Sequence, residues 1–247
     1  MRRGAAWLLL AVLAAAPGAA RAEFSPEDIL LKTDEVRNPQ MDYTVHVAVT
    51  TEKPGRAPSV STYEVLVKGR EDAVVKTLSP PIERGRVLLM KAHDLWAFLP
   101  DVSKPLRVSL QERLTGQVAN GDLARANFSG DYTATLAAVE KITGENYFVM
   151  DLTAKTPEVT YGRVKLWVHA QTFYPLKAEF YAISGRLLKT CSYEDYRQLG
   201  GRLRPTRLVM SDPILTGSRS ILEYDELTIE DLPEKYFTKD YLKKLSD

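Results

Sequence analysis

The sequence predicts a mainly β fold: one strongly curved antiparallel sheet of about eleven strands, with one or two helices set against it. Apolar and polar residues alternate with a period of two, as in residues 41–51, where Tyr43, Val45 and Val47 point one way. Glycine, proline or Asp/Asn signals separate most of these segments at intervals of roughly 8–12 residues. No helical stretch is long enough to supply the crossovers of a parallel sheet.

The predicted strands share either this alternation or runs of β-branched and aromatic residues between turn signals. They are residues 41–51, 61–69, 72–79, 85–92, 94–100, 104–110, 132–142, 146–154, 162–170, 174–183, 185–196, 204–212 and 218–229. Short connections between them predict hairpins, and hence antiparallel neighbours.

Two helices are predicted outside these strands. Residues 24–36 have Ser25 as a natural N-cap, Pro26 at the first helical position and two acidic residues in the first turn. Near the other end, residues 233–245 carry an apolar stripe with helical spacing, which predicts a short docking helix. The stripe consists of Tyr236, Phe237, Tyr241, Leu242 and Leu245.

The stretch TGQVANGDLARANFSGDY interrupts the alternation. It covers residues 115–132 and overlaps a segment, residues 111–129, that is rich in Asn, Gly and Arg and joins two predicted strands. Its three glycines match no phosphate-binding spacing, and no lysine follows them. A connection of this length is either a functional loop or a disordered one. Its apolar residues indicate that it packs against other parts of the chain, and a short helix is expected in GDLARAN.

The first 22 residues are expected to be a cleaved signal peptide. They begin with two arginines, continue as an unbroken apolar run over residues 5–16, and end with small residues at Ala20 and Ala22. The run is shorter than the roughly 20 residues of a spanning helix. A retained N-terminal anchor is the alternative. Residues 23–247 are then expected to form a single β domain, exported and soluble in the periplasm.

Charge and cysteine content narrow the class of protein. Without the three arginines of the leader the formal net charge falls from +1 to −2. This charge gives no positive electrostatic field to attract nucleic acid and no polybasic patch to bind a membrane. Cys191 is the single cysteine, so no disulfide framework is expected. Its place in a strand-like run indicates a small packed side chain rather than a nucleophile.

No catalytic, cofactor or metal site is predicted, so we do not expect an enzyme. The three histidines are far apart in sequence and form no metal-ligand spacing with Cys, Asp or Glu. No nucleophile-elbow pattern occurs. Acidic residues such as Asp122, Asp131 and Glu140 could pair, but the chain has 32 acids, so such a pair is weak support for catalysis.

The chain is rich in aromatic residues, with 12 Tyr and 7 Phe, and their positions bear on whether the sheet encloses a cavity. Ordinary core packing explains most of them. The alternative is a sheet whose concave side is too curved to be filled by its own side chains, which would leave an apolar hollow for a ligand.

Several long runs resemble the outer-membrane lipoprotein-sorting proteins. They are GRVLLMKAHDLWAFLP, RVSLQERLTGQVANGDLARANFSGDY, YGRVKLWVHAQTFYPLKAEFYAISGRLLKTCSYEDYR and GRLRPTRLVMSD, and the resemblance extends from about Glu27 to Leu242. These proteins are periplasmic carriers related in fold to the lipoprotein chaperone of Gram-negative bacteria. The resemblance implies an incomplete, half-open antiparallel β-barrel of about eleven strands, with helices plugging or lidding its concave side. It also implies a cavity that accepts acyl chains, and no catalytic role.

The functional hypothesis is therefore a periplasmic carrier that binds acyl chains and passes its cargo toward the outer membrane. The implied partners are an acylated lipoprotein or other lipid as cargo, an inner-membrane exporter of the resistance-nodulation-division or ATP-binding-cassette type as donor, and an outer-membrane acceptor. The chain is expected to be a monomer that binds no nucleic acid and no cofactor. The alternative is a non-catalytic periplasmic interaction or structural module associated with a membrane exporter. An enzyme of lipocalin-like shape is a third hypothesis.

The residues predicted for the cavity and its lid are apolar or aromatic, with one arginine. They are Val45, Val47, Val65, Val67, Trp96, Phe98, Leu123, Arg125, Phe128, Leu166 and Phe180. Gly116, Gly121 and Gly130 would let the loop move, while Arg125 would pair with Asp122 or Asp131 in a closed state. A static structural loop is the alternative.

Overall fold

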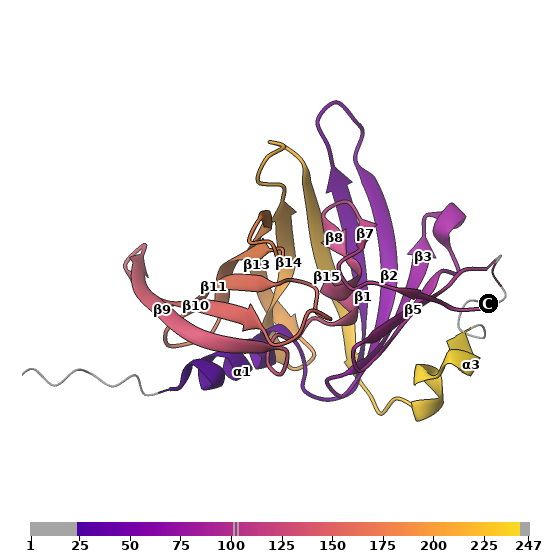
Figure 1. Cartoon of the computed structure of the whole chain (residues 1–247), viewed down its shortest axis with the longest axis horizontal. Coiled ribbons are helices and arrows are strands. Elements are labelled where there is room, and N and C mark those ends of the chain that lie inside the picture. Colours follow the sequence, from indigo (N-terminus) through magenta and orange to yellow (C-terminus); the bar gives the residue numbers. More distant parts are fainter. Residues whose placement is uncertain (1–23, 101, 103, 243–247) are drawn as a thin grey trace, which may run out of the picture.

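The computed structural model describes residues 24–100, 102 and 104–242 (Figure 1). The predicted signal peptide and Leu245 lie outside the described residues. The single domain expected over residues 23–247 stays a prediction.

Thirteen strands form one antiparallel sheet, in the order β6-β5-β4-β3-β2-β1-β15-β14-β13-β12-β11-β10-β9. In chain order they are β1 (Tyr43–Glu52), β2 (Ser59–Lys68), β3 (Asp72–Ser79), β4 (Val87–Lys91), β5 (Asp94–Phe98), β6 (Leu106–Val108), β9 (Tyr132–Ile142), β10 (Glu145–Ala154), β11 (Arg163–His169), β12 (Pro175–Tyr181), β13 (Leu187–Leu199), β14 (Arg202–Ser211) and β15 (Arg219–Ile229). Every segment predicted as a strand is in this sheet, so the expected count of about eleven was too low.

The sheet is curved but not closed. Its outermost strands, β6 and β9, do not pair with each other, while β1 and β15 pair at its centre. The chain therefore leaves one edge of the sheet at β6 and re-enters at the opposite edge at β9. This connection includes a separate two-stranded sheet, β7 (Arg113–Thr115) with β8 (Val118–Ala119), and the short helix α2 (Asn120–Ala124). The helix expected in GDLARAN is confirmed, and the small sheet was not predicted.

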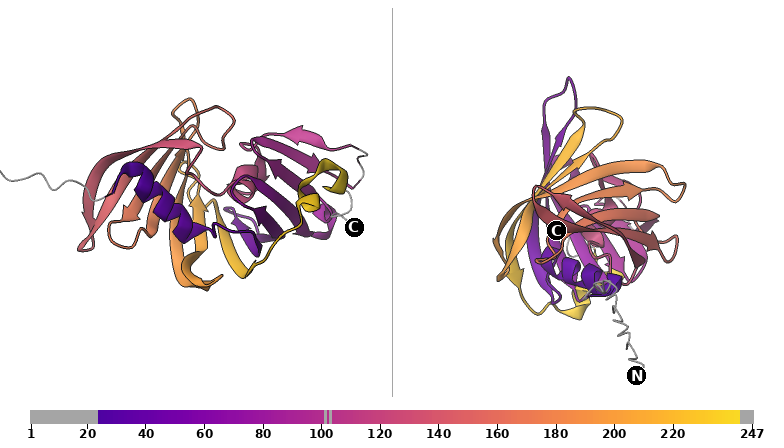
Figure 2. Two further views of the ribbon diagram at one scale, coloured as in Figure 1. Left: turned by 90° about the horizontal axis from the view of Figure 1, so that it is seen from below. Right: turned by 90° about the vertical axis from the view of Figure 1, so that its left-hand side faces the viewer.

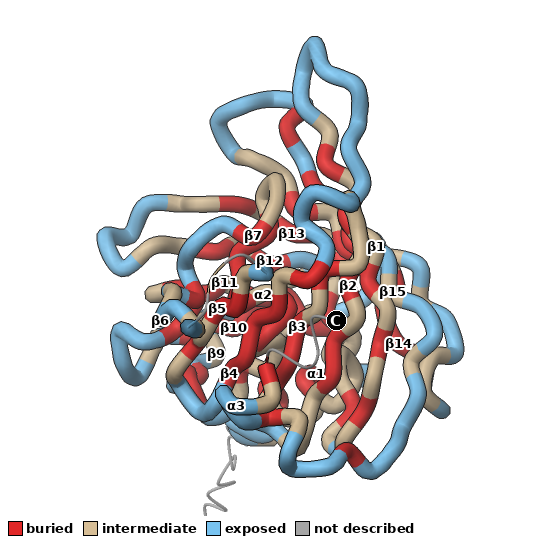
Figure 3. The backbone as a smooth tube through the Cα atoms, turned by 90° about the vertical axis from the view of Figure 1, so that its right-hand side faces the viewer, coloured by how far each residue is buried: buried red, intermediate tan, exposed pale blue. Residues whose placement is uncertain are grey.

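The period-two pattern of β1 matches its burial. Tyr43, Val45, Val47 and Val49 are buried and alternate with half-buried residues. In the register with β2, Val45 lies opposite Val65, so one face of the two strands is continuously apolar. Figure 3 shows buried stretches along the strands and exposed residues at the hairpin turns.

Helix α1 (Pro26–Arg37) begins as its sequence predicts. The Ser25 hydroxyl accepts a hydrogen bond from the Asp28 amide at 3.1 Å, and the Asp28 carboxylate accepts one from the Ser25 amide at 3.1 Å. This capping box satisfies amide groups that the first turn leaves unpaired. Ile29 and Leu30 are buried in the core cluster of the concave face. Helix α1 contacts β9 and β14, and α2 contacts β3 and β4, so the two helices lie over different parts of that face (Figure 2).

The opposite face of β2 to β5 is covered by the C-terminal segment. This segment contains the 3-10 helix η2 (Glu234–Phe237) and the short helix α3 (Lys239–Leu242). Phe237 and Leu242 are fully buried and pack with Leu89 and Phe98. The docking segment predicted from the apolar stripe is confirmed over the described residues. Strand β4 is consequently buried on both faces.

We predict that Phe237→Ala lowers the free energy of unfolding by about 3–5 kcal/mol, because it leaves a cavity in this second cluster. Urea denaturation of the variant measures the change. Asp240→Ala, at an exposed position two residues before Leu242, is the control and should be nearly neutral. An equally small effect of both substitutions would show that the C-terminal segment does not stabilise the sheet.

Candidate functional site

Residues 109–131, which we call the cover, cross the concave face between the two edges of the sheet. Leu114, Val118 and Leu123 are buried in the core cluster of this face, as the apolar residues of the segment predicted. The Gly121 amide donates to the Leu110 carbonyl at 3.0 Å, and the Gln117 amide donates to the Ser220 hydroxyl at 2.9 Å. The cover is therefore an ordered layer bonded both to itself and to the sheet.

Two glycines of the cover allow close packing against the sheet. A Cβ at Gly116 would lie 2.2 Å from the Ser220 hydroxyl oxygen, and the residue has φ +51°. A Cβ at Gly121 would lie 1.9 Å from the Thr160 hydroxyl oxygen. Lack of space explains both glycines in this closed arrangement. Gly130 has φ +100° and open space where a Cβ would lie, so backbone conformation requires this glycine instead.

A cavity lies between the sheet, α1 and the cover. Its volume is about 60 Å³, enough for a few water molecules. Side chains of the cover and of α1 thus fill most of the concave side. The residues that line the cavity include Arg37, Tyr43, Val45, Arg125, Phe128, Tyr132, Tyr161, Phe180, Tyr193, Arg204 and Tyr224.

Aromatic rings form a continuous path along this cavity. The Arg37 guanidinium lies 4.2 Å from the centre of the Phe128 ring. Phe128 lies 6.3 Å from Phe180, and Phe180 lies 4.4 Å from Tyr161, measured between ring centres. The wall is therefore apolar over most of its length, with a cation at one end of the path.

The structure brings together some of the predicted cavity residues. Val45, Arg125, Phe128 and Phe180 line the cavity. The residues Val47, Val65, Val67, Leu123 and Leu166 belong to or pack against the same core cluster without lining it.

Trp96 and Phe98 do not lie at the cavity. Phe98 belongs to the second cluster, on the face covered by the C-terminal segment, and Trp96 packs against that cluster. Lys239 from that segment lies 3.1 Å from the centre of the Trp96 ring. Because both faces of this part of the sheet are buried, alternation alone does not indicate which side chains face the cavity.

The cavity residues that were not predicted from the sequence are polar or phenolic. Arg37 comes from the end of α1, and Arg204 comes from the start of β14. The alternation of β13 and β15 contains a signal for Tyr193 and Tyr224, but nothing local in the sequence marks the two arginines as neighbours.

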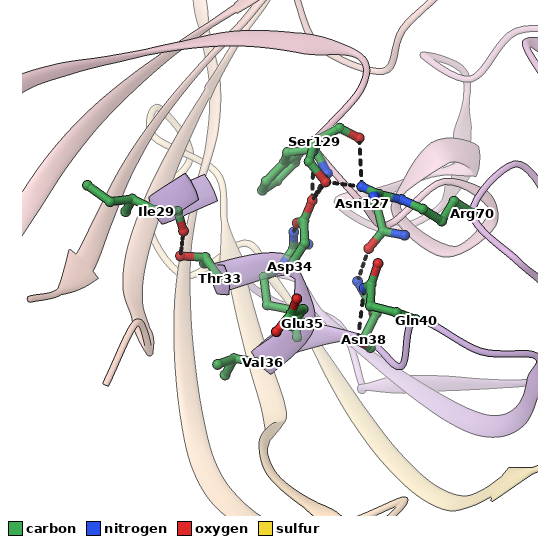
Figure 4. Close-up of polar contacts among 12 residues, drawn as sticks. Ile29, Thr33, Asp34, Glu35, Val36, Asn38, Gln40, Arg70, Asn127 and Ser129 are labelled. Atoms are coloured by element: carbon green, nitrogen blue, oxygen red, sulfur yellow. Dashed lines mark hydrogen bonds and ion pairs between the residues drawn. The ribbon is translucent and has the colours of Figure 1, made fainter. Parts of the chain in front are cut away.

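The carboxylate of Asp34 joins α1 to the cover (Figure 4). Its Oδ2 accepts hydrogen bonds from the Phe128 amide at 2.9 Å, the Ser129 amide at 2.6 Å and the Ser129 hydroxyl at 2.6 Å. Its Oδ1 pairs with Arg37 at 3.1 Å. The side chain of Asp34 is fully buried, so each of these partners compensates for the loss of water. Asn38 also donates to Asn127 at 3.0 Å.

A buried ion pair anchors the middle of the cover. Lys189 Nζ lies 2.5 Å from Asp122 Oδ2, and the two side chains are only 4% and 5% exposed. Lys189 also donates to the Gln117 carbonyl at 2.7 Å, and the Tyr161 hydroxyl donates to Asp122 at 2.5 Å. Burial is the main cause that raises the pKa of Tyr161, and the Asp122 carboxylate adds to it. The hydroxyl therefore stays protonated as a donor.

Arg125 pairs with Asp131, which settles which of its two predicted partners it contacts. Its Nη2 donates to Asp131 Oδ1 at 2.6 Å, and its Nε contacts the other carboxylate oxygen. The third contact is from Nη1 to the Ala92 carbonyl at 2.6 Å. Asp122, the alternative partner, is held by Lys189.

Among the described residues, no group of three His, Cys, Asp or Glu side chains is placed to hold a metal ion. Within the same part of the chain, no helix has the length and apolar character needed to cross a membrane.

The fold and site define a class of proteins in which an open, curved antiparallel sheet holds a covered apolar cavity. A family model described as "Uncharacterized protein" matches residues 69–244. The chain is similar to a LolA superfamily protein from Nitrosomonas europaea, with 50% identity, a TM-score of 0.85, and coverage of 88% of this chain and 99% of that one. The chain belongs to the LolA superfamily, which confirms the predicted resemblance to lipoprotein-sorting proteins.

Two more distant structures share the fold alone. A DUF1329 family protein from Desulfovibrio piger is 20% identical, with a TM-score of 0.75 and coverage of 88% of this chain and 97% of that one. A domain named as an outer membrane lipoprotein-sorting protein, from Vibrio parahaemolyticus, is 22% identical, with a TM-score of 0.74 and coverage of 88% and 98%. A comparison with curated proteins found no match.

We predict that Asp34→Ala weakens the attachment of the cover. The substitution leaves two amides and a hydroxyl without their acceptor, which should cost about 2 kcal/mol of unfolding free energy. Cys191 reports the opening, because it lies on β13 between Lys189 and Tyr193, two residues from each, and shares their face. Burial raises the pKa of its thiol to about 12, so at pH 8 the closed protein should alkylate slowly.

The alkylation rate of Cys191 should rise in Asp34→Ala and stay unchanged in Glu27→Ala, an exposed position on the same helix. Equal rates in all three proteins, measured by mass spectrometry under native conditions, would mean that Asp34 does not hold the cover.

We also predict that Gly121→Ala destabilises the protein by about 1–3 kcal/mol, because α2 must move away from Thr160. Thermal unfolding measures the loss. The double variant Gly121→Ala/Thr160→Gly should recover part of it, since the two sites share one contact. No recovery would argue against the packing explanation of this glycine.

Proposed function

We propose that the protein is a periplasmic carrier that binds the acyl chains of a lipoprotein or another lipid and passes the cargo toward the outer membrane. Membership of the LolA superfamily supports this proposal. The observation that carries it is the aromatic cavity beneath a cover that polar contacts hold to α1 and to the sheet.

The closed cavity is too small for an acyl chain, so loading requires the cover to move. Burying one methylene contributes roughly 0.8 kcal/mol, and a sixteen-carbon chain supplies on the order of 10 kcal/mol before the costs of binding. A typical hydrogen bond contributes about 1 kcal/mol net. A chain that replaces the apolar contacts of Phe128 and Leu123 can therefore offset the loss of the contacts around Asp34.

Transfer needs partners, because a bilayer stabilises an acyl chain about as well as a protein cavity does. A carrier of this kind needs a donor and an acceptor rather than very tight binding. We propose an inner-membrane exporter of the resistance-nodulation-division or ATP-binding-cassette type as donor, and an outer-membrane acceptor. Loading energy then comes from the donor. The carrier itself performs no catalysis in this proposal.

The test is native mass spectrometry of the protein purified from the periplasm. We expect a co-purifying lipid or acylated peptide, and we expect Phe128→Asp to reduce its occupancy because it places a charge at the apolar wall. Ile82→Asp, at a position that is 93% exposed, is the matched control and should keep the wild-type occupancy.

A clean apo mass together with no binding of an apolar fluorescent probe would reject the carrier. That result would favour a periplasmic interaction or structural module. Unchanged probe binding by a folded Phe128→Asp variant would reject the cover as part of the binding site.

A further inference from the structure

The charges around the cavity leave one buried cation without a carboxylate. Three cations have acidic partners: Arg37 pairs with Asp34, Lys189 with Asp122, and Arg125 with Asp131. Arg204 lines the same cavity and is only 4% exposed. Among the described residues it has no acidic partner within ion-pair distance. A buried charge without a counter-charge is costly.

The contacts of Arg204 are all with backbone carbonyls. Its Nη1 donates to the carbonyls of Glu35 at 2.8 Å and Val36 at 3.0 Å, and its Nε donates to that of Leu199 at 3.1 Å. Burial lowers the pKa of Arg204, and the nearby Arg202 lowers it further. No carboxylate offsets these two effects.

A structural role explains part of this geometry. A cation near the last carbonyls of a helix is favourable, and α1 ends at Arg37. That role uses Nη1 and Nε. The second terminal nitrogen, Nη2, has no hydrogen-bond partner within the described part of the chain. It is also not one of the fully enclosed unpaired atoms, and Arg204 lines the cavity, so Nη2 keeps exposed surface and a free donor.

Phenol groups with free donors converge on the same region. The hydroxyls of Tyr43, Tyr193 and Tyr224 have no hydrogen-bond partners among the residues that the structure describes, and all three residues line the cavity. Burial raises the pKa of Tyr43 to about 12, while Arg204 and Arg37 oppose this shift. Burial also raises the pKa of Tyr193 and Tyr224, so all three hydroxyls remain protonated and available as donors.

We propose that the part of the cavity lined by Arg37 and Arg204 binds the anionic headgroup, a phosphate or a carboxylate, of the lipid that the carrier transports. The inference rests on the proposed function and specifies its substrate class as an anionic amphiphile. Arg204 supplies the uncompensated charge, Arg37 a second guanidinium, and the tyrosines supply neutral donors. The tail then follows the ring path from Phe128 to Phe180 and Tyr161 once the cover has moved.

Decyl phosphate, decanol and inorganic phosphate separate the contributions of headgroup and tail. Each is titrated calorimetrically, below its micelle concentration, into the full-length mature protein after delipidation. We expect decyl phosphate to bind about tenfold more tightly than decanol, which corresponds to about one charge-assisted hydrogen bond. Inorganic phosphate should bind much more weakly than decyl phosphate because it lacks the tail.

Arg204→Gln should reduce the affinity for decyl phosphate about tenfold and leave that for decanol unchanged. The control is Arg207→Gln on the same strand, where the arginine pairs with Glu194 outside the cavity. Tyr193→Phe keeps the ring and removes only the hydroxyl. It should weaken decyl phosphate binding severalfold, and it tests the proposal even if Arg204→Gln fails to fold.

Each other outcome overturns a defined part of the proposal. Equal binding of decyl phosphate and decanol would reject the headgroup site and leave the carrier intact. Inorganic phosphate binding as tightly as decyl phosphate would indicate a free-anion site and reject the amphiphile. Failure of both decyl probes to bind would reject the proposed function itself.

Discussion

The constraint on which this structure depends is the path of the chain from one edge of the sheet to the other. Strand β6 ends one edge and β9 begins the opposite one, so the 109–131 cover must cross the concave face. A crossing backbone carries polar groups that need partners wherever water is excluded. Asp34 supplies acceptors near one end of the cover, and Lys189 supplies a donor near its middle. The cavity is the space that remains between these fixed points.

Polar anchors of this kind fix position more than they add stability. A buried ion pair such as that of Lys189 and Asp122 gains little net free energy, because desolvation of both charges offsets their attraction. Its partners are nevertheless specific, so the cover has one register on the sheet. Apolar contacts from Leu114, Val118 and Leu123 supply most of the stabilisation. An acyl chain can replace these apolar contacts, but it has no groups that could replace the polar ones.

The sequence predicts the local elements of this fold well and the site only in part. Period-two alternation and runs of β-branched and aromatic residues between turn signals locate the strands of the large sheet, and the signals at Ser25 and Pro26 locate the start of α1. Strand count and the small β7–β8 sheet are less predictable, because short strands depend on tertiary pairing. Trp96 and Phe98 are misplaced because the C-terminal segment buries the second face of their strand. Arg37 and Arg204 meet only after folding, so no local pattern marks them.

The same topology limits how the cavity can enlarge. The cover is tethered at both ends to edge strands, and it cannot swing away as a lid with one free end. Strand β6 has three residues and pairs only with β5, whereas β9 has eleven and pairs along its length with β10. Separating β6 from β5 breaks far fewer hydrogen bonds than separating β9 from β10. Opening should therefore begin at the β6 end, while the hydrogen bond from the Lys155 amide to the Asp131 carbonyl keeps the β9 end in place. Such an opening would expose the apolar path first beside α2 and leave Arg204 at the end of α1 undisturbed.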